Sequence, residues 1–178
     1  MSAPELSRPV KPRTLPAGPL TVDASETERA ALAARFGVTA IPALTAIVDF
    51  GTKDDAVLAE GTLAATITQP CAVTREELSY DVSEPLMLRF VPAGSVPDYA
   101  PDEEIELDAE DLDQIEYEGD AFDLGEAIAQ TLALAIDPYR EGPGAEEARR
   151  KAGIVSDEEQ APSGPLAEAL AALKKDQA

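Results

Sequence analysis

Cys71 is the one cysteine of the chain, and it follows Pro70 at the end of a long alternating segment. A thiol nucleophile is usually activated by a neighbouring base, and the chain contains no histidine. One cysteine also forms no internal disulfide, and it makes no zinc or iron–sulfur site within one chain. Because a free cysteine most often packs as a small apolar side chain, we expect Cys71 to be buried and unreactive.

Carboxylates are the second group with potential chemistry, and many of them are concentrated in one segment. Between Arg89 and Arg140 there are 15 acidic residues and no basic one, in a chain of net charge −21. Carboxylate oxygens bind calcium, but this run lacks the glycine-punctuated D-x-D-x-D-G spacing of a calcium loop. Two interpretations stay open: a solvated acidic loop that keeps the protein soluble, or a docking surface for a basic protein. In the second interpretation the candidate contacts are Glu103, Glu104, Glu106 and Asp108.

Several functional classes find no support in the sequence. It contains neither G-x-x-x-x-G-K-[ST] nor G-x-G-x-x-G, so we expect no phosphate-binding loop. No apolar stretch approaches the roughly 18 residues of a membrane-spanning helix. The net charge of −21 also disfavours binding to an anionic membrane surface. The proline-rich N-terminus lacks the apolar core of a secretory signal, and the single cysteine favours a reducing compartment. We therefore expect a cytoplasmic protein without a cofactor or metal.

The strands that would position these residues follow from hydrophobic periodicity in a chain of 178 residues, the size of one domain. Alternating apolar residues predict strands over 44–50 and 57–68, and the short Gly/Asp segment between them predicts a hairpin. Gly61 within the second strand marks a bulge or a close backbone contact. Shorter alternating runs predict further strands at 20–22, after Pro85 at 86–90, and at 105–107.

Two helices are predicted from capping residues and from the helical spacing of apolar side chains. A capping box of Ser25 and Glu28 starts a helix over 26–36. Asp123 is the expected N-cap of a second helix over 124–135. Weaker helical signals lie at 146–152 and 166–173.

Together these elements predict an α+β fold, in which two or three helices pack on an antiparallel β-sheet that is open or barrel-like. We expect a single domain over 20–140, preceded by an extended proline-rich arm over 1–19. A flexible acidic and alanine-rich tail with a short helix is expected over 141–178. The patterns leave the oligomeric state open.

A family resemblance rests on short segments that occur in a constant order over roughly residues 5–140. The most specific are Gln-x-Cys-x-Val-Thr at 69–74 and Asp-Leu-Gly-Glu at 123–126. The other segments are Leu6–Val10, Ala24–Arg29, Leu32–Phe36, Gly61–Ala65, Glu84–Pro85 and Gly119–Phe122. In these segments the chain resembles the YceD family, the large ribosomal RNA subunit accumulation proteins. It resembles the branch without the paired C-terminal cysteines of many members, so no metal site is implied.

The resemblance implies a role in the synthesis, processing or stability of 23S ribosomal RNA. We expect a non-catalytic ribosome-biogenesis factor that binds a basic ribosomal protein or assembly factor and contacts the RNA indirectly. The alternative is a metal-dependent enzyme acting on RNA or nucleotides, which needs several carboxylates at one rigid position. Besides the acidic run, the candidate partner-binding residues are Arg29, Arg35, Gln69, Thr74, Asp123 and Glu126. Turn chemistry at Gln69 and Thr74, and solvated helix charges at the two arginines, remain open as purely structural roles.

Overall fold

The computed structural model describes residues 4–95 and 114–154 of the 178-residue chain. The candidates Glu103, Glu104, Glu106 and Asp108, the strand expected at 105–107 and the helix expected at 166–173 lie outside the described residues. The chain divides into two compact units. The larger comprises Met1–Pro70 and Glu77–Pro138, and the smaller comprises Cys71–Glu76 and Tyr139–Ala178.

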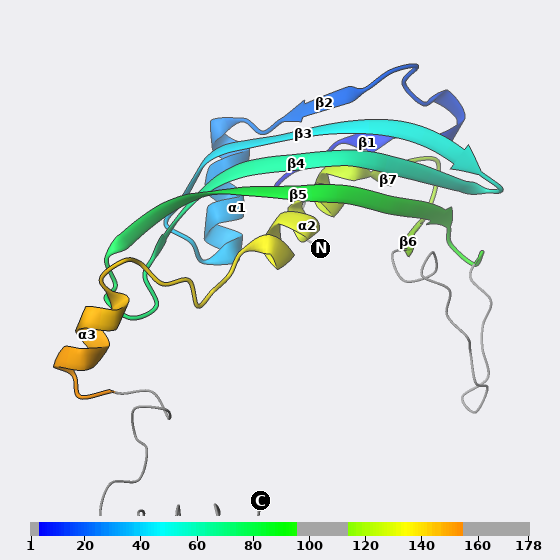
Figure 1. Cartoon of the computed structure of the whole chain (residues 1–178). Helices are drawn as coiled ribbons and strands as arrows, with labels where there is room; N and C mark the ends of the chain where they lie inside the picture. The colour runs from blue at the N-terminus through cyan, green and yellow to red at the C-terminus, as the bar shows by residue number, and fades with distance from the viewer. Residues whose placement is uncertain (1–3, 96–113, 155–178) are drawn as a thin grey trace, which may run out of the picture. The chain divides into compact units, whose positions relative to one another are not determined.

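The larger unit is built on a five-stranded sheet in the order β2-β3-β4-β5-β6 (Figure 1). The four strands β2, β3, β4 and β5 pair antiparallel, and they span Leu20–Asp23, Ala40–Lys53, Ala56–Pro70 and Glu77–Pro92. The fifth strand, β6 (Gln114–Tyr117), is parallel to β5. Among the described strands β2 and β6 are the two edges, so the α+β fold has an open sheet and not a barrel. The parallel β6 was not predicted, because alternation along four residues does not report the direction in which a strand joins a sheet.

The strands β3 and β4 form the predicted hairpin. Their register is continuous from Lys53↔Ala56 to Ala43↔Thr66, with an irregularity towards Ala40. A close backbone contact with the neighbouring strand β3 explains why position 61 is a glycine. An added Cβ at Gly61 would lie 1.9 Å from the backbone oxygen of Ile47, so no larger residue fits without moving β3.

The strand β5 is longer than predicted, because it starts at Glu77 and continues through Pro85. Pro85 lies opposite Thr62 of β4, whereas β6 pairs with β5 only over Arg89–Pro92. At Pro85 one side of β5 therefore has no strand neighbour within the described residues. A missing N–H is tolerated at such an edge, since it interrupts no hydrogen-bond ladder.

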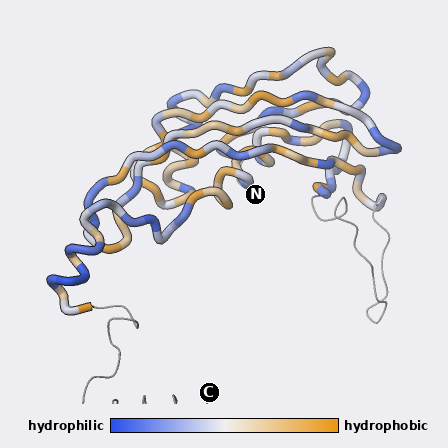
Figure 2. Tube along the Cα trace, viewed as in Figure 1, coloured by the Kyte–Doolittle hydropathy of each residue, from blue (hydrophilic) through white to orange (hydrophobic). Residues whose placement is uncertain are grey.

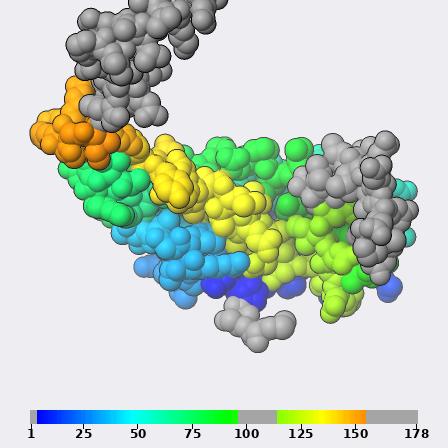
Figure 3. All heavy atoms as spheres, turned by 90° about the horizontal axis from the view of Figure 1, so that it is seen from below, coloured from blue at the N-terminus to red at the C-terminus, as the bar shows by residue number. Residues whose placement is uncertain are grey.

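The helices α1 (Glu26–Phe36) and α2 (Leu124–Ala135) lie on the same face of the sheet (Figure 1). Figure 3 looks onto this face, where α1 and α2 lie side by side. Each begins at its predicted cap: the capping box of Ser25 and Glu28 is complete, and Asp123 accepts two backbone N–H bonds from the first turn of α2. The remaining elements are β1 (Pro9–Val10), which pairs antiparallel with β7 (Phe122–Asp123), the 3₁₀ turn η1 (Pro12–Thr14), and α3 (Ala145–Lys151) in the smaller unit.

The core of the larger unit lies between the sheet and its two helices. Alternate residues of β4, among them Leu63 and Ile67, are fully buried, and Figure 2 shows this alternation of hydropathy along the strands. Phe122 stacks on Phe90 with 4.0 Å between the ring centroids and 16° between the ring planes. The fully buried helix residues are Leu32, Leu124, Ile128, Ala129 and Leu132.

Candidate functional site

Arg8, just before β1, binds the first turn of α1. Its Nη1 and Nη2 atoms donate to the two carboxylate oxygens of Glu28, at 2.6 and 3.0 Å. Glu28 also accepts the backbone N–H of Ser25, which closes the capping box. The hydrogen bonds from Arg8 are the main cause that lowers the pKa of Glu28 to about 2. One carboxylate thus caps α1 and anchors the N-terminal segment.

Asp123 joins the same N-terminal segment to the start of α2. Its Oδ1 accepts the backbone N–H of Arg8 at 2.7 Å, and its Oδ2 accepts the Ser7 hydroxyl at 2.7 Å. The same Oδ1 accepts the helix N–H groups of Gly125 at 2.9 Å and Glu126 at 3.3 Å. Asp123 is therefore the N-cap that the sequence predicted, and its carboxylate is already occupied by four donors within the fold.

Gly125 allows the N-terminal segment to approach α2 closely. A Cβ at this position would lie 2.7 Å from the backbone oxygen of Leu6 and 2.8 Å from the nitrogen of Arg8. Both contacts are with backbone atoms, which cannot rotate away as a side chain could. The Asp-Leu-Gly segment of the family-like motif is thus explained by packing: Asp123 caps, Leu124 is fully buried, and Gly125 makes room.

The two candidate arginines of α1 are engaged by other parts of the larger unit. Arg35 donates both terminal nitrogens to Glu126 of α2, at 2.9 and 2.8 Å, and one of them also to Glu5 at 2.9 Å. These bonds from Arg35 lower the pKa of Glu126. Arg29 donates to the backbone oxygens of Ile41 and Ala24, at 3.0 and 2.5 Å. The structure therefore brings Arg35 and Glu126 together as a bridge between the helices.

Gln69, near the end of β4, is 4% exposed. Its Nε2 donates to the backbone oxygen of Asp137 at 2.7 Å, and its Oε1 accepts the hydroxyl of Tyr80 at 3.0 Å. Both ends of the amide are therefore used inside the larger unit. Partner binding by Gln69 stays a prediction, and this placement favours a structural role.

In the smaller unit, Cys71 is buried, with 0% of its surface exposed. Its Sγ accepts the backbone N–H groups of Val73 and Thr74, both at 3.4 Å, and of Gly142 at 3.3 Å. Hydrogen bonding by Thr74 is the largest of the causes that lower the pKa of the Cys71 thiol to about 7. The expected burial is confirmed, whereas low reactivity stays a prediction. Thr74 also accepts the N–H of Glu76 at 3.3 Å, which is the expected turn chemistry.

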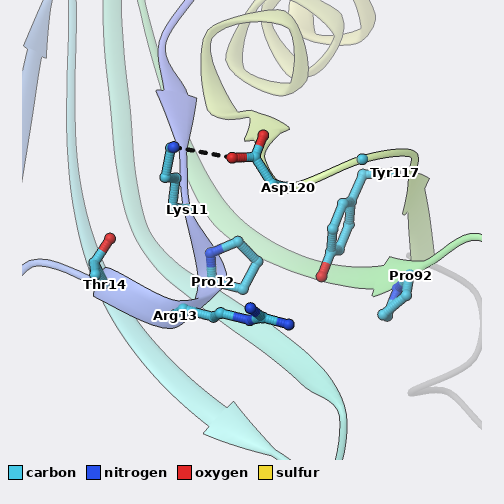
Figure 4. A pocket seen from close by; sticks show the side chains of 8 residues that line it. Lys11, Pro12, Arg13, Thr14, Pro92, Tyr117 and Asp120 are labelled. Carbon is cyan, nitrogen blue, oxygen red and sulfur yellow. Dashed lines mark ion pairs between the residues drawn. The ribbon is translucent and has the colours of Figure 1, made fainter.

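A pocket of about 490 Å³ lies beside η1 in the larger unit (Figure 4). Tyr117 and Pro92 line one part of it, and Arg13 extends into the same space. Lys11 forms an ion pair with Asp120 at 2.9 Å, which lowers the pKa of Asp120. The pocket lining therefore combines the Lys11–Asp120 ion pair, the guanidinium of Arg13 and the aromatic ring of Tyr117.

The described residues hold neither a metal-binding cluster nor a membrane-spanning helix. Residues 4–95 and 114–154 contain no group of three or more acidic or cysteine side chains placed to hold a metal ion. Within the same ranges no helix has the length and apolar composition needed to cross a membrane. The absence of a bound metal was predicted from the sequence, and it remains a prediction.

Comparison with known families gives a match over residues 59–175, more than half of the chain, to the family described as large ribosomal RNA subunit accumulation protein YceD. The chain belongs to the YceD family. No curated protein and no solved structure matches it. The matched range contains the segments at 61–65, 69–74 and 119–126, whereas those at 6–10 and 24–36 precede it.

The residues of the 123–126 motif of this YceD chain lie at the junction of the N-terminal segment with α1 and α2, whereas those of the 69–74 motif lie elsewhere. Asp123, Glu126 and Arg35 were predicted as partner contacts, and all three are hydrogen-bonded within that junction. Arg8 and Glu5 complete it, although neither was predicted as a partner contact. The role of Arg8 follows from its contact with Glu28, the glutamate of the capping box. No local sequence pattern reveals this contact, because the two residues are 20 positions apart.

Proposed function

We propose that this chain is a non-catalytic, cytoplasmic ribosome-biogenesis factor that supports accumulation of 23S ribosomal RNA by binding a basic ribosomal protein or assembly factor. The observation that carries the proposal is a family described by accumulation of large-subunit RNA, in a chain of net charge −21. Such a charge repels RNA and attracts basic proteins. The protein components of the large subunit that this chain binds would therefore have to be basic.

The placement of the basic residues supports indirect contact with RNA. Binding to phosphates requires Lys and Arg side chains that replace counterions, and here 14 of them face 35 acidic residues. In the described part of the chain Arg8, Arg29 and Arg35 are all held by hydrogen bonds inside the larger unit. RNA phosphates would have to compete with those bonds, so we expect weak binding to naked RNA.

The test compares two classes of ligand for the purified full-length chain. One series uses individual basic proteins of the large ribosomal subunit, and the other uses protein-free fragments of 23S RNA. We expect measurable binding to at least one basic protein, with an association rate that falls as salt rises. We expect only weak, salt-sensitive binding to the RNA fragments.

Three results would contradict the proposal. Tight and salt-resistant binding to protein-free RNA would move the function to direct RNA recognition. Magnesium-dependent cleavage of RNA or nucleotides by the pure chain would establish the enzyme alternative instead. Absence of binding to every basic protein tested, with RNA binding present, would also overturn it.

A further inference from the structure

The face of the sheet opposite α1 and α2 has no helix packed on it within the described residues of the larger unit (Figure 1). Two large apolar side chains of this face are strongly exposed, Ile47 of β3 at 50% and Met87 of β5 at 69%. Single exposed apolar residues are ordinary, so what matters is which residues surround these two.

The register of the strands places Ile47 and Met87 in one small block. Ile47 lies opposite Thr62, and Thr62 lies opposite Pro85. The next row of the same face is formed by Asp49, Glu60 and Met87, in the same strand order. With about 4.8 Å between strands and about 7 Å between successive residues of one face, the block measures about 10 by 7 Å.

Asp49 and Glu60 are two carboxylates placed directly opposite each other on β3 and β4. Both are exposed, and neither carboxylate has a hydrogen bond or ion pair within the described residues. Like charges in a directly opposite cross-strand pair are destabilising. The fold therefore carries an unfavourable pair that a cation bound between the two carboxylates would relieve.

Two other acidic residues of the same face show the contrast. Asp23 of β2 accepts the hydroxyl of Thr45 opposite it at 2.8 Å. Asp81 of β5 accepts the hydroxyl of Thr66 opposite it, also at 2.8 Å. These carboxylates have partners within the sheet, whereas the Asp49–Glu60 pair lies between two exposed apolar side chains and has none.

We propose that this uncovered face docks a lysine- or arginine-rich segment of a protein partner. Its cationic groups lie on Asp49 and Glu60, and its aliphatic stems cover Ile47 and Met87. Charge complementarity selects the occupant, because the carboxylates repel RNA and the chain as a whole carries −21. Long basic side chains match the block, since their stems bury apolar surface while their charged heads contact carboxylates. This inference rests on the proposed function and names the surface that would serve it.

The experiment uses the full chain and a synthetic peptide of lysine and leucine, with a peptide of glutamate and leucine as the ligand control. The test variant is Asp49→Asn with Glu60→Gln. The matched control is Asp23→Asn with Asp81→Asn, which changes the net charge equally on the same face and keeps acceptors for Thr45 and Thr66. Loss of two exposed ion pairs predicts that the test variant binds the basic peptide about tenfold more weakly. We expect the control to bind nearly as the unaltered chain does.

A second variant, Ile47→Thr with Met87→Thr, tests the apolar part with residues suited to strands, and we expect weaker binding of the same peptide. Thermal unfolding should show that the carboxylate variant is at least as stable as the unaltered chain, because the like-charge pair is gone. Equal weakening by both charge variants, or no weakening by either, would overturn the proposal. So would binding of a short RNA that the Asp49/Glu60 substitution abolishes.

A further arm separates this inference from the proposed function. If a basic large-subunit protein binds the unaltered chain and the Asp49/Glu60 variant equally well, this docking face is wrong while the proposed function stands. If basic proteins fail to bind the unaltered chain while RNA binds it, the proposed function itself is wrong.

Discussion

Arg8 and Glu28 form a bidentate ion pair between the N-terminal segment and the first turn of α1. The two nitrogen–oxygen distances are 2.6 and 3.0 Å, and the carboxylate also accepts the N–H of Ser25. Charge-assisted pairs with two parallel bonds are stronger and more directional than single ones. The chain before β1 is therefore fixed to the same residue that completes the cap of α1.

Replacing Glu28 by Gln tests the ion pair and spares the cap, because Gln also closes a capping box. We expect the free energy of unfolding at neutral pH to fall by about 1–2 kcal/mol, since solvent screens this partly exposed pair. The folded pKa of about 2 lies below the ordinary value, so the contribution is present above about pH 4.3 and is lost towards pH 2. Urea unfolding across that range should show the variant and the unaltered chain converging. The exposed Glu26 of the same turn gives a control, and an equal effect of Glu26→Gln would refute the assignment.

Gly125→Ala tests the close approach of the N-terminal segment to α2. Alanine normally stabilises a helix relative to glycine by up to about 1 kcal/mol. Here the added Cβ meets backbone atoms at 2.7 and 2.8 Å, so we expect a net loss of about 1–3 kcal/mol. Trypsin should also cut after Arg13, the nearest basic residue that no proline follows, faster than in the unaltered chain. Gly51→Ala is the control, because its Cβ would meet only the Leu58 side chain at 4.0 Å. A stabilised Gly125→Ala variant would show that the segment does not pack as described.

Cys71 should titrate at a lower pH in the folded chain than in the unfolded chain. The hydrogen bonds to its sulfur favour the thiolate, and they lower the thiol pKa to about 7. Ultraviolet absorbance of the thiolate should therefore rise near pH 7 in native protein and near pH 8.5 in denaturant. The change should vanish in Cys71→Ala. Because the sulfur is buried, alkylation of the native chain should stay much slower than in denaturant; equal rates would show an accessible thiol.

The acidic run predicts a salt-dependent association with a basic partner. Replacing Glu103, Glu104, Glu106 and Asp108 by their amides should slow binding of a basic large-subunit protein and flatten its dependence on salt. Charges of this kind act over about 8 Å at physiological salt, so they affect encounter more than the bound state. Stopped-flow association at several salt concentrations measures both effects. An unchanged rate would assign the run to solubility alone.

Features encoded by neighbouring residues were predictable. The capping residues Ser25, Glu28 and Asp123 mark the starts of two helices, because a cap is a contact between residues three positions apart. The hairpin of β3 and β4 follows from alternation on both sides of a short turn. Gly61 was expected to mark a bulge or a close contact, and the close contact is confirmed.

Features that depend on distant segments were not predictable in the same way. The strand β5 passes through Pro85 because β6 joins only its later residues, which the sequence around the proline does not show. Gln69 was assigned to a partner surface, yet its amide contacts Tyr80 and the backbone of Asp137, 68 residues away. Arg35 and Glu126 were named separately as partner contacts, and their pairing appears only when α1 and α2 lie together.

The bond between the N–H of Arg8 and the carboxylate of Asp123 joins residues 115 positions apart in the chain. During synthesis the N-terminal segment leaves the ribosome first, and its docking site leaves long afterwards. Arg8 can bind Glu28 early, but until Asp123 emerges the segment has no carboxylate of α2 to bind, and the first strand β1 has no β7 to pair with. Contacts of such long separation close late, because the intervening chain must be ordered before they form. Attachment of the N-terminal segment to α2 is therefore a late step in the maturation of the larger unit, and trypsin cleavage after Arg13 in nascent chains of increasing length would time it.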